Sequence, residues 1–121
     1  MSTQATTIKA PVAGANEVRL VGRVSGEASS LVLPSGDELV TFRISVTRPD
    51  VGTPARQKVD SVPCCTWTSR VRRSAMTWRT DDVVEVSGAV RCRFFQTGRG
   101  VGSRVEVEVT SARLIRRAPA A

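Results

Sequence analysis

The residues whose types and spacing best suit a chemical task are Arg91, Arg93 and Phe95, at alternate positions of one segment. In an extended strand, alternate side chains share a face, so two guanidinium groups and one ring are predicted to point the same way. A guanidinium group is a planar fork of donors that suits phosphate oxygens, and its flat face can stack on a base. An aromatic ring stacks on any base, whatever the nucleotide sequence. This segment therefore predicts contact with unpaired nucleic acid.

Other basic and aromatic residues are predicted to extend this surface. Arg19, Arg23 and Arg43 fall on the outward faces of predicted strands, and Trp67 closes another strand. Lys58, Arg99 and Arg104 lie in or beside predicted loops and are expected to close over a bound strand. Binding of a single strand needs positive charge along its phosphates. The candidate nucleic-acid-binding residues are Phe95, Arg91, Arg93, Trp67, Arg43, Arg19, Arg23, Lys58, Arg99 and Arg104.

The first three residues also have a structural interpretation. The two arginines could instead pair across a hairpin with Glu106 and Glu108, and such exposed ion pairs contribute about 0–1 kcal/mol each. Phe95 could simply cap the base of that hairpin. We favour nucleic-acid contact for all three residues.

Neighbouring aromatic and basic residues are interpreted differently. Phe94 has the parity of a core residue and is predicted to be structural, as is Trp78. Trp67 stays open between stacking on a base and sealing the core. The basic residues of the predicted helix are expected to form a solvated face: Arg70, Arg72 and Arg73.

Catalysis has no comparable support in the sequence. The chain has no histidine, which removes the commonest general base and the commonest zinc ligand. Cys64, Cys65 and Cys92 form no CxxC pair, and we expect three small, reduced, core-type residues. Asp81-Asp82 is interpreted as turn chemistry at a helix–strand junction. We therefore predict no enzyme activity, no metal and no other cofactor.

Length and charge set the class of protein. The 121 residues suit one domain, and 18 Lys+Arg against 11 Asp+Glu give a formal charge of +7, which attracts polyanions. No apolar run is long enough to span a membrane and the start lacks a signal peptide's apolar region, so we expect a cytoplasmic protein. We predict a flexible arm over 1–15, a folded domain over 16–115 and a disordered end over 116–121.

Between the ends, apolar and polar residues alternate with the period of two that is typical of strands. Long strands are predicted over about 17–25, 38–47, 59–67, 82–95 and 103–115, with a short strand and a turn within 31–40. The segment 68–80 is the only predicted helix. The glycine-rich segment 96–102 joins two strands and is predicted to be a hairpin loop, since a phosphate-binding loop leads into a helix. This order predicts an all-β, five-stranded OB-fold barrel with one short helix between strands 3 and 4.

With these elements in order, the chain resembles the bacterial single-stranded DNA-binding protein family over residues 16–113. NEVRLVGRV, beginning at Asn16, is similar to the family's opening strand, and PSG at 34–36 with FRISV at 42–46 resembles its turn and following strand. GAVRCRFF at 88–95 resembles the family's Gly-x-Leu-Arg-x-Arg-x-aromatic strand. The resemblance implies sequence-independent binding of single-stranded DNA in replication, repair or recombination, by a nucleoid-associated homo-oligomer, a tetramer or a dimer.

The same resemblance assigns individual positions. It implies that Phe95 stacks on a base, that Trp67 occupies a second aromatic position, and that Trp78 packs on the barrel where the helix ends. Two aromatic positions of the family lack an aromatic residue, near Asp50 and at Ser61. The chain ends in RRAPAA, without the family's long acidic tail, so we expect a shortened paralogue that does not recruit repair enzymes in that way.

Two alternatives use the same fold. An RNA-binding OB module would stack RNA bases on the same face. The second alternative is a protein-interaction OB domain that has lost nucleic-acid binding. The two missing aromatic residues motivate this alternative.

Overall fold

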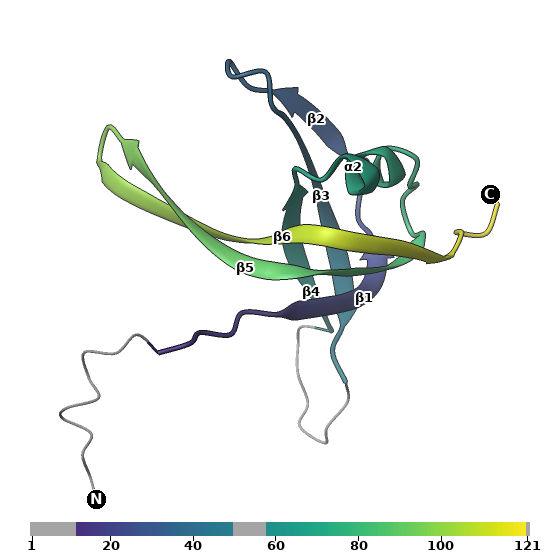
Figure 1. The fold of residues 1–121 in the computed structure, drawn as a ribbon. Coiled ribbons are helices and arrows are strands. Elements are labelled where there is room, and N and C mark those ends of the chain that lie inside the picture. Colours follow the sequence, from purple (N-terminus) through teal and green to yellow (C-terminus); the bar gives the residue numbers. More distant parts are fainter. Residues whose placement is uncertain (1–11, 50–57, 121) are drawn as a thin grey trace, which may run out of the picture.

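The computed structural model describes residues 12–49 and 58–120. Within these ranges six strands form one strongly curved sheet, and one short helix lies against it (Figure 1). The second and third strands form one projecting hairpin, and the last two strands form another. The elements in chain order are β1 (Val18–Val24), β2 (Ser29–Val32), β3 (Glu38–Thr47), β4 (Val59–Thr66), α2 (Ser69–Ala75), β5 (Val83–Thr97) and β6 (Gly100–Arg116). β2 begins at Ser29, two residues before the segment 31–40 in which a short strand was expected. The predicted all-β OB-fold, with its helix between the third and fourth long strands, is confirmed.

The sheet closes into a barrel because β1 pairs on both of its edges. The strand order is β1-β5-β6-β4-β3-β2, and β1 additionally pairs antiparallel with β3 at Arg23↔Ser45 and Val24↔Ile44. Gly22 permits this approach, since a Cβ there would lie only 2.4 Å from the carbonyl oxygen of Ser45. A glycine on the inner face thus lets β1 and β3 approach closely enough to pair.

The core consists of the inward sides of the alternating strands. Val24, Val40, Ile44, Val84 and Val86 are fully buried, as the period-two pattern predicts. α2 closes one end of the barrel with the buried side chains of its inner face, Val71 and Ala75.

The predicted helix over 68–80 is too long, because α2 ends at Ala75. Trp78 lies beyond the helix end but is buried as predicted, with its ring 5.3 Å edge-on from that of Phe42. The seven-residue helix is also the longest in the described residues, and none there has the length and apolarity to cross a membrane.

The β5–β6 hairpin is longer than the sequence predicts. The expected loop over 96–102 is mostly strand, since β5 reaches Thr97 and β6 begins at Gly100. This hairpin leaves the barrel as an arm (Figure 1), which corrects two predictions about residues on it. Phe94 is 73% exposed and not a core residue, and Cys92 is exposed, whereas Cys64 and Cys65 are buried as expected.

Both ends of the domain are fixed by side chains. The Asn16 amide donates to the carbonyl of Val90 (2.8 Å) and accepts from its N–H (2.9 Å), which extends the β1–β5 pairing. At the other end, β6 continues to Arg116, one residue past the predicted domain boundary. The buried carboxylate of Asp82 then accepts from the N–H of Ala118 (2.7 Å) and from Arg117 (2.8 Å).

Candidate nucleic-acid interface

A groove of about 630 Å³ lies between the two hairpins, over the outer side of β3 and β4. It brings together four of the candidate residues from four different parts of the chain: Arg43, Trp67, Arg93 and Arg104. Arg43 is exposed and has no ion-pair partner among residues 12–49 and 58–120. The groove therefore joins cationic side chains to an indole ring, the two kinds of group that bind an unpaired nucleic-acid strand.

The arginines of the hairpin are held by a ladder of ion pairs. Arg91 contacts Glu108 (3.3 Å), and Arg93 contacts both Glu106 (2.7 Å) and Glu108 (3.7 Å). Arg104, two residues before Glu106 on β6, contacts the same carboxylate at 3.8 Å. The cross-hairpin pairing weighed from the sequence is thus present. The side chains of Arg91 and Arg93 nevertheless remain 51% and 41% exposed, so pairing orients their guanidinium groups without covering them.

Glu106 is the buried member of this ladder. Burial alone would raise its pKa, but hydrogen bonds donated by Arg93 and by the thiol of Cys65 hold the pKa of this carboxyl below its ordinary value. The same surroundings raise the pKa of Cys65 to about 12, first through burial and then through Glu106. Cys65 is therefore a protonated, unreactive donor under the groove, and the Glu106 carboxylate stays ionised beside the arginines.

Phe95 lies on the same face of the hairpin as Arg91 and Arg93 and is 47% exposed. It is paired across the hairpin with Gly102, and its ring covers that glycine. The ring is neither sealed in the core nor fully surrounded by solvent, so one side stays accessible for stacking.

Trp67 directly follows β4 and is half-buried at the groove wall. Its carbonyl accepts a hydrogen bond from the guanidinium group of Arg72, which fixes the backbone at the start of α2. Arg72 is therefore partly engaged, unlike the exposed Arg70 and Arg73 of the expected solvated helix face.

The chain is similar in sequence to a known protein family. The sequence profile described as "Single-strand binding protein family" matches residues 15–115. The chain belongs to this family.

Curated relatives within the family are distant. The chain is 27% identical to single-stranded DNA-binding protein 3 of Listeria innocua over 85 residues, which cover 70% of this chain and 53% of the relative. It is 25% identical to single-stranded DNA-binding protein A of Bacillus subtilis over 85 residues, 70% of this chain and 49% of the relative. The chain thus spans about half the length of these curated relatives.

Solved structures share the fold. A Plasmodium falciparum SSB complex with single-stranded DNA has a TM-score of 0.72 at 20% identity, covering 89% of this chain and 99% of that one. A mitochondrial single-stranded DNA binding protein from S. cerevisiae has a TM-score of 0.63 at 12% identity, covering 84% and 96%. At these identities the likeness establishes the OB-fold, in agreement with the family assignment.

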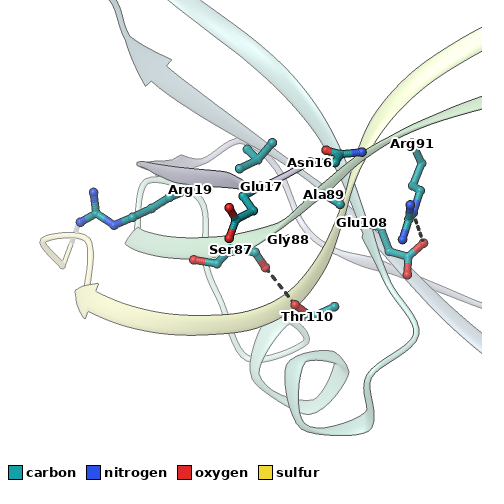
Figure 2. A pocket seen from close by; sticks show the side chains of 10 residues that line it. Asn16, Glu17, Arg19, Ser87, Gly88, Ala89, Arg91, Glu108 and Thr110 are labelled. Carbon is teal, nitrogen blue, oxygen red and sulfur yellow. Dashed lines mark hydrogen bonds and ion pairs between the residues drawn. The ribbon is translucent and has the colours of Figure 1, made fainter. Parts of the chain in front are cut away.

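A second hollow of about 510 Å³ is lined by two candidate residues, Arg19 and Arg91. Arg19 and Arg91 lie at its opposite ends, and Figure 2 shows Arg91 turned toward Glu108. Arg19 is bonded to Glu85, which Arg113 also contacts at 2.6 Å. Both candidates therefore keep exposed guanidinium groups, but they lie on the side of the barrel where β1 meets β5.

The remaining candidates do not converge on the groove. Arg23 lines a small pocket of about 280 Å³ with Arg116 and Arg117 at the far end of β1. Lys58 is exposed immediately before β4, and Arg99 is exposed at the hairpin tip. Ser61 and Asp50 mark the two family positions that lack an aromatic residue in this chain. Ser61 is exposed in β4, whereas Asp50 lies outside the described residues.

Sequence reasoning missed two features of these sites. Arg116 and Arg117 fall in the end predicted to be disordered, but β6 extends to Arg116 and Arg117 is bonded to Asp82. The acidic lining of the groove, Glu27 and Glu106, was also missed as part of a site. For Glu106 the alternating pattern carried the signal, because it places this residue on the same face as Arg104.

Proposed function

We propose that this chain binds single-stranded DNA without sequence preference, by phosphate contacts and base stacking, and that it catalyses no reaction. The observation that carries the proposal is the groove that Arg43, Arg93 and Arg104 line together with the indole of Trp67. Membership of the single-strand binding protein family and the likeness to a solved complex with single-stranded DNA support it. A role in DNA replication, repair or recombination follows from this ligand.

The proposed path of the nucleic acid combines the groove with the outer face of the hairpin. Arg91, Arg93 and Phe95 share that face, and the ladder keeps the two guanidinium groups in fixed, exposed positions. Pre-oriented donors lose less side-chain entropy when they bind a phosphate. Arg19, Arg23, Lys58 and Arg99 are proposed as peripheral contacts that add charge along the strand.

The decisive test compares two neighbouring phenylalanines on opposite faces of the hairpin. Phe95→Ala removes the proposed stacking ring, and Phe94→Ala removes an equally large ring from the other face. Stacking contributes about 1–3 kcal/mol per base, so Phe95→Ala should raise the Kd for oligo-dT about 5- to 140-fold. Phe94→Ala should leave the Kd within about twofold, measured by fluorescence anisotropy of a labelled oligo-dT at a protein concentration where both variants have the oligomeric state of the parent.

The same assay separates the alternative functions. Matched DNA, RNA and duplex oligonucleotides at low salt should rank single-stranded DNA first. Clear preference for RNA would favour the RNA-binding module. No binding of any oligonucleotide would contradict the proposal and favour a protein-interaction domain.

We also propose that the protein is a homo-oligomer, a tetramer or a dimer, in the cytoplasm and associated with the nucleoid, where its proposed ligand is found. The second face of the hairpin supports association, because it exposes a row of apolar side chains: Val90, Phe94, Val101 and Val105. Native mass measurement over a dilution series tests the oligomer. A monomer at all concentrations would contradict it.

A further inference from the structure

The cross-hairpin pair of Phe95 and Gly102 places an aromatic ring where a side chain would otherwise lie. A Cβ at Gly102 would be 2.6 Å from Cε2 and 2.7 Å from Cζ of the Phe95 ring. These distances are well inside van der Waals contact, so the edge of the ring occupies the position of the missing side chain.

The backbone itself does not require glycine at this position. The described glycines with a positive φ are Gly26, Gly36 and Gly100, and Gly102 is not among them. Any residue can adopt the extended conformation of Gly102 within β6. The contact with the ring is thus what distinguishes this glycine in the structure.

The neighbouring pair shows what happens without a glycine partner. Phe94 is paired with Ser103, which has a Cβ, and its ring is 73% exposed. Phe95, paired with Gly102, is 47% exposed. The ring of Phe95 therefore lies down against β6, whereas the ring of Phe94 stands out into solvent.

We propose that Gly102 is a positioning residue for base stacking: its missing side chain lets the Phe95 ring rest on the β6 backbone in a fixed orientation. This inference rests on the proposed function of Phe95. An aromatic ring that covers a cross-strand glycine shields its backbone and is itself held in place. A held ring does not have to be immobilised when a base stacks on it.

Addition of a methyl group at position 102 should displace the ring rather than the strand. The clashing atoms are the far end of a side chain with two rotatable bonds, whereas the backbone on either side is held in the β5–β6 ladder. Gly102→Ala should therefore keep the fold and lose the ring orientation. Re-immobilising one side chain on binding corresponds to a Kd about 2- to 12-fold higher.

A double-mutant cycle with Phe95→Ala tests the inference. Gly102→Ala should weaken oligo-dT binding in the parent chain, and should change nothing further in the Phe95→Ala background, where no ring is present to displace. Gly98→Ala is the matched control, because a Cβ at Gly98 has no atom within 4 Å, and it should bind like the parent. Unchanged binding by Gly102→Ala, or the same loss in both backgrounds, would overturn the inference.

A second measurement uses only the parent chain and Phe95→Ala, and so does not depend on the folding of Gly102→Ala. In the parent chain the ring current of Phe95 should shift the NMR resonances of the Gly102 Hα protons, and Phe95→Ala should remove the shift. Equal Gly102 Hα shifts in both chains would also overturn the inference. If Phe95→Ala binds oligo-dT like the parent while the ring-current shift is present, the proposed role of Phe95 in binding is wrong although the ring is positioned as described.

Discussion

Replacement of Arg43 by alanine removes one positive charge from the groove without breaking an ion pair among the described residues. Arg43 is exposed on the outer face of β3 and lines the groove beside Trp67. Arg93 is a less direct probe, because its removal would also leave the buried Glu106 carboxylate without its closest cationic partner. Arg43 therefore isolates the contribution of one phosphate contact.

The size of the effect follows from counterion release. For single strands, the slope of log K against log salt changes by about 0.7 for each phosphate contact. Loss of one contact should flatten the slope by about 0.7, so the advantage of the parent chain over Arg43→Ala shrinks about 2.6-fold between about 50 and about 200 mM salt. The measurement is anisotropy of labelled oligo-dT over this range.

Arg48→Ala is the matched control for charge. Arg48 follows β3 directly, and its guanidinium group is already bound to Asp60, with Nη2 at 2.6 Å and Nε at 3.0 Å from Oδ1. The variant carries the same change in net charge but should keep the parent slope. Equal flattening in both variants would show that only net charge matters, and an unchanged slope in Arg43→Ala would refute the proposed groove contact.

Three further predictions concern stability. Trp78→Ala should lower the free energy of unfolding by about 3–5 kcal/mol in urea titrations, since it empties a buried aromatic site; a smaller loss than about 1 kcal/mol would contradict the packing. Hydrogen bonds from the N–H of Arg79 and other donors lower the pKa of Asp82, so its stabilising effect is present above the unfolded pKa and is lost as pH falls toward the folded pKa. Asp82→Asn should therefore lower the Tm at neutral pH, with the difference narrowing in acid; a constant difference would contradict this linkage. Gly88→Ala would put a Cβ 1.9 Å from the carbonyl oxygen of Glu108, a backbone atom, and should sharply reduce the Tm; a native-like melting curve would contradict this close approach.

The barrel was predictable because its burial follows local alternation. Val40, Phe42 and Ile44 alternate with polar residues and are all buried, so the period-two pattern identified both the strand and its inner face. Trp78 was also predicted correctly to be buried, because it lies at helical spacing from Val71 and Ala75, which face the barrel. It is buried although the helix ends at Ala75.

Phe94 shows where local alternation stops being informative. Parity specifies which face of a strand a residue occupies, but not whether that face is covered. β5 leaves the barrel beyond Ala89, and from Val90 onward most of its residues are exposed on both faces. The position of this departure depends on how far β6 and β4 pair, which is a long-range property of the fold.

The groove could be predicted only in part for the same reason. The basic and aromatic residues were recognised individually, yet Arg43 and Arg104 meet only through the pairing of β3 with β4 and of β4 with β6. Arg23, from an equally regular strand position, lies with Arg116 in a different pocket. Which outward-facing arginines converge depends on strand order, and a single sequence does not specify that order.

The attachment of Arg117 and Ala118 to Asp82 has a practical consequence for labelling. These contacts hold the chain at the end of the barrel, and Figure 1 shows that end on the opposite side of the molecule from the β5–β6 hairpin. A dye or a surface linker joined after Ala118 would start from a fixed point remote from the arm. Immobilised molecules would thus present the hairpin outward, which suits force or single-molecule measurements on individual nucleic-acid strands.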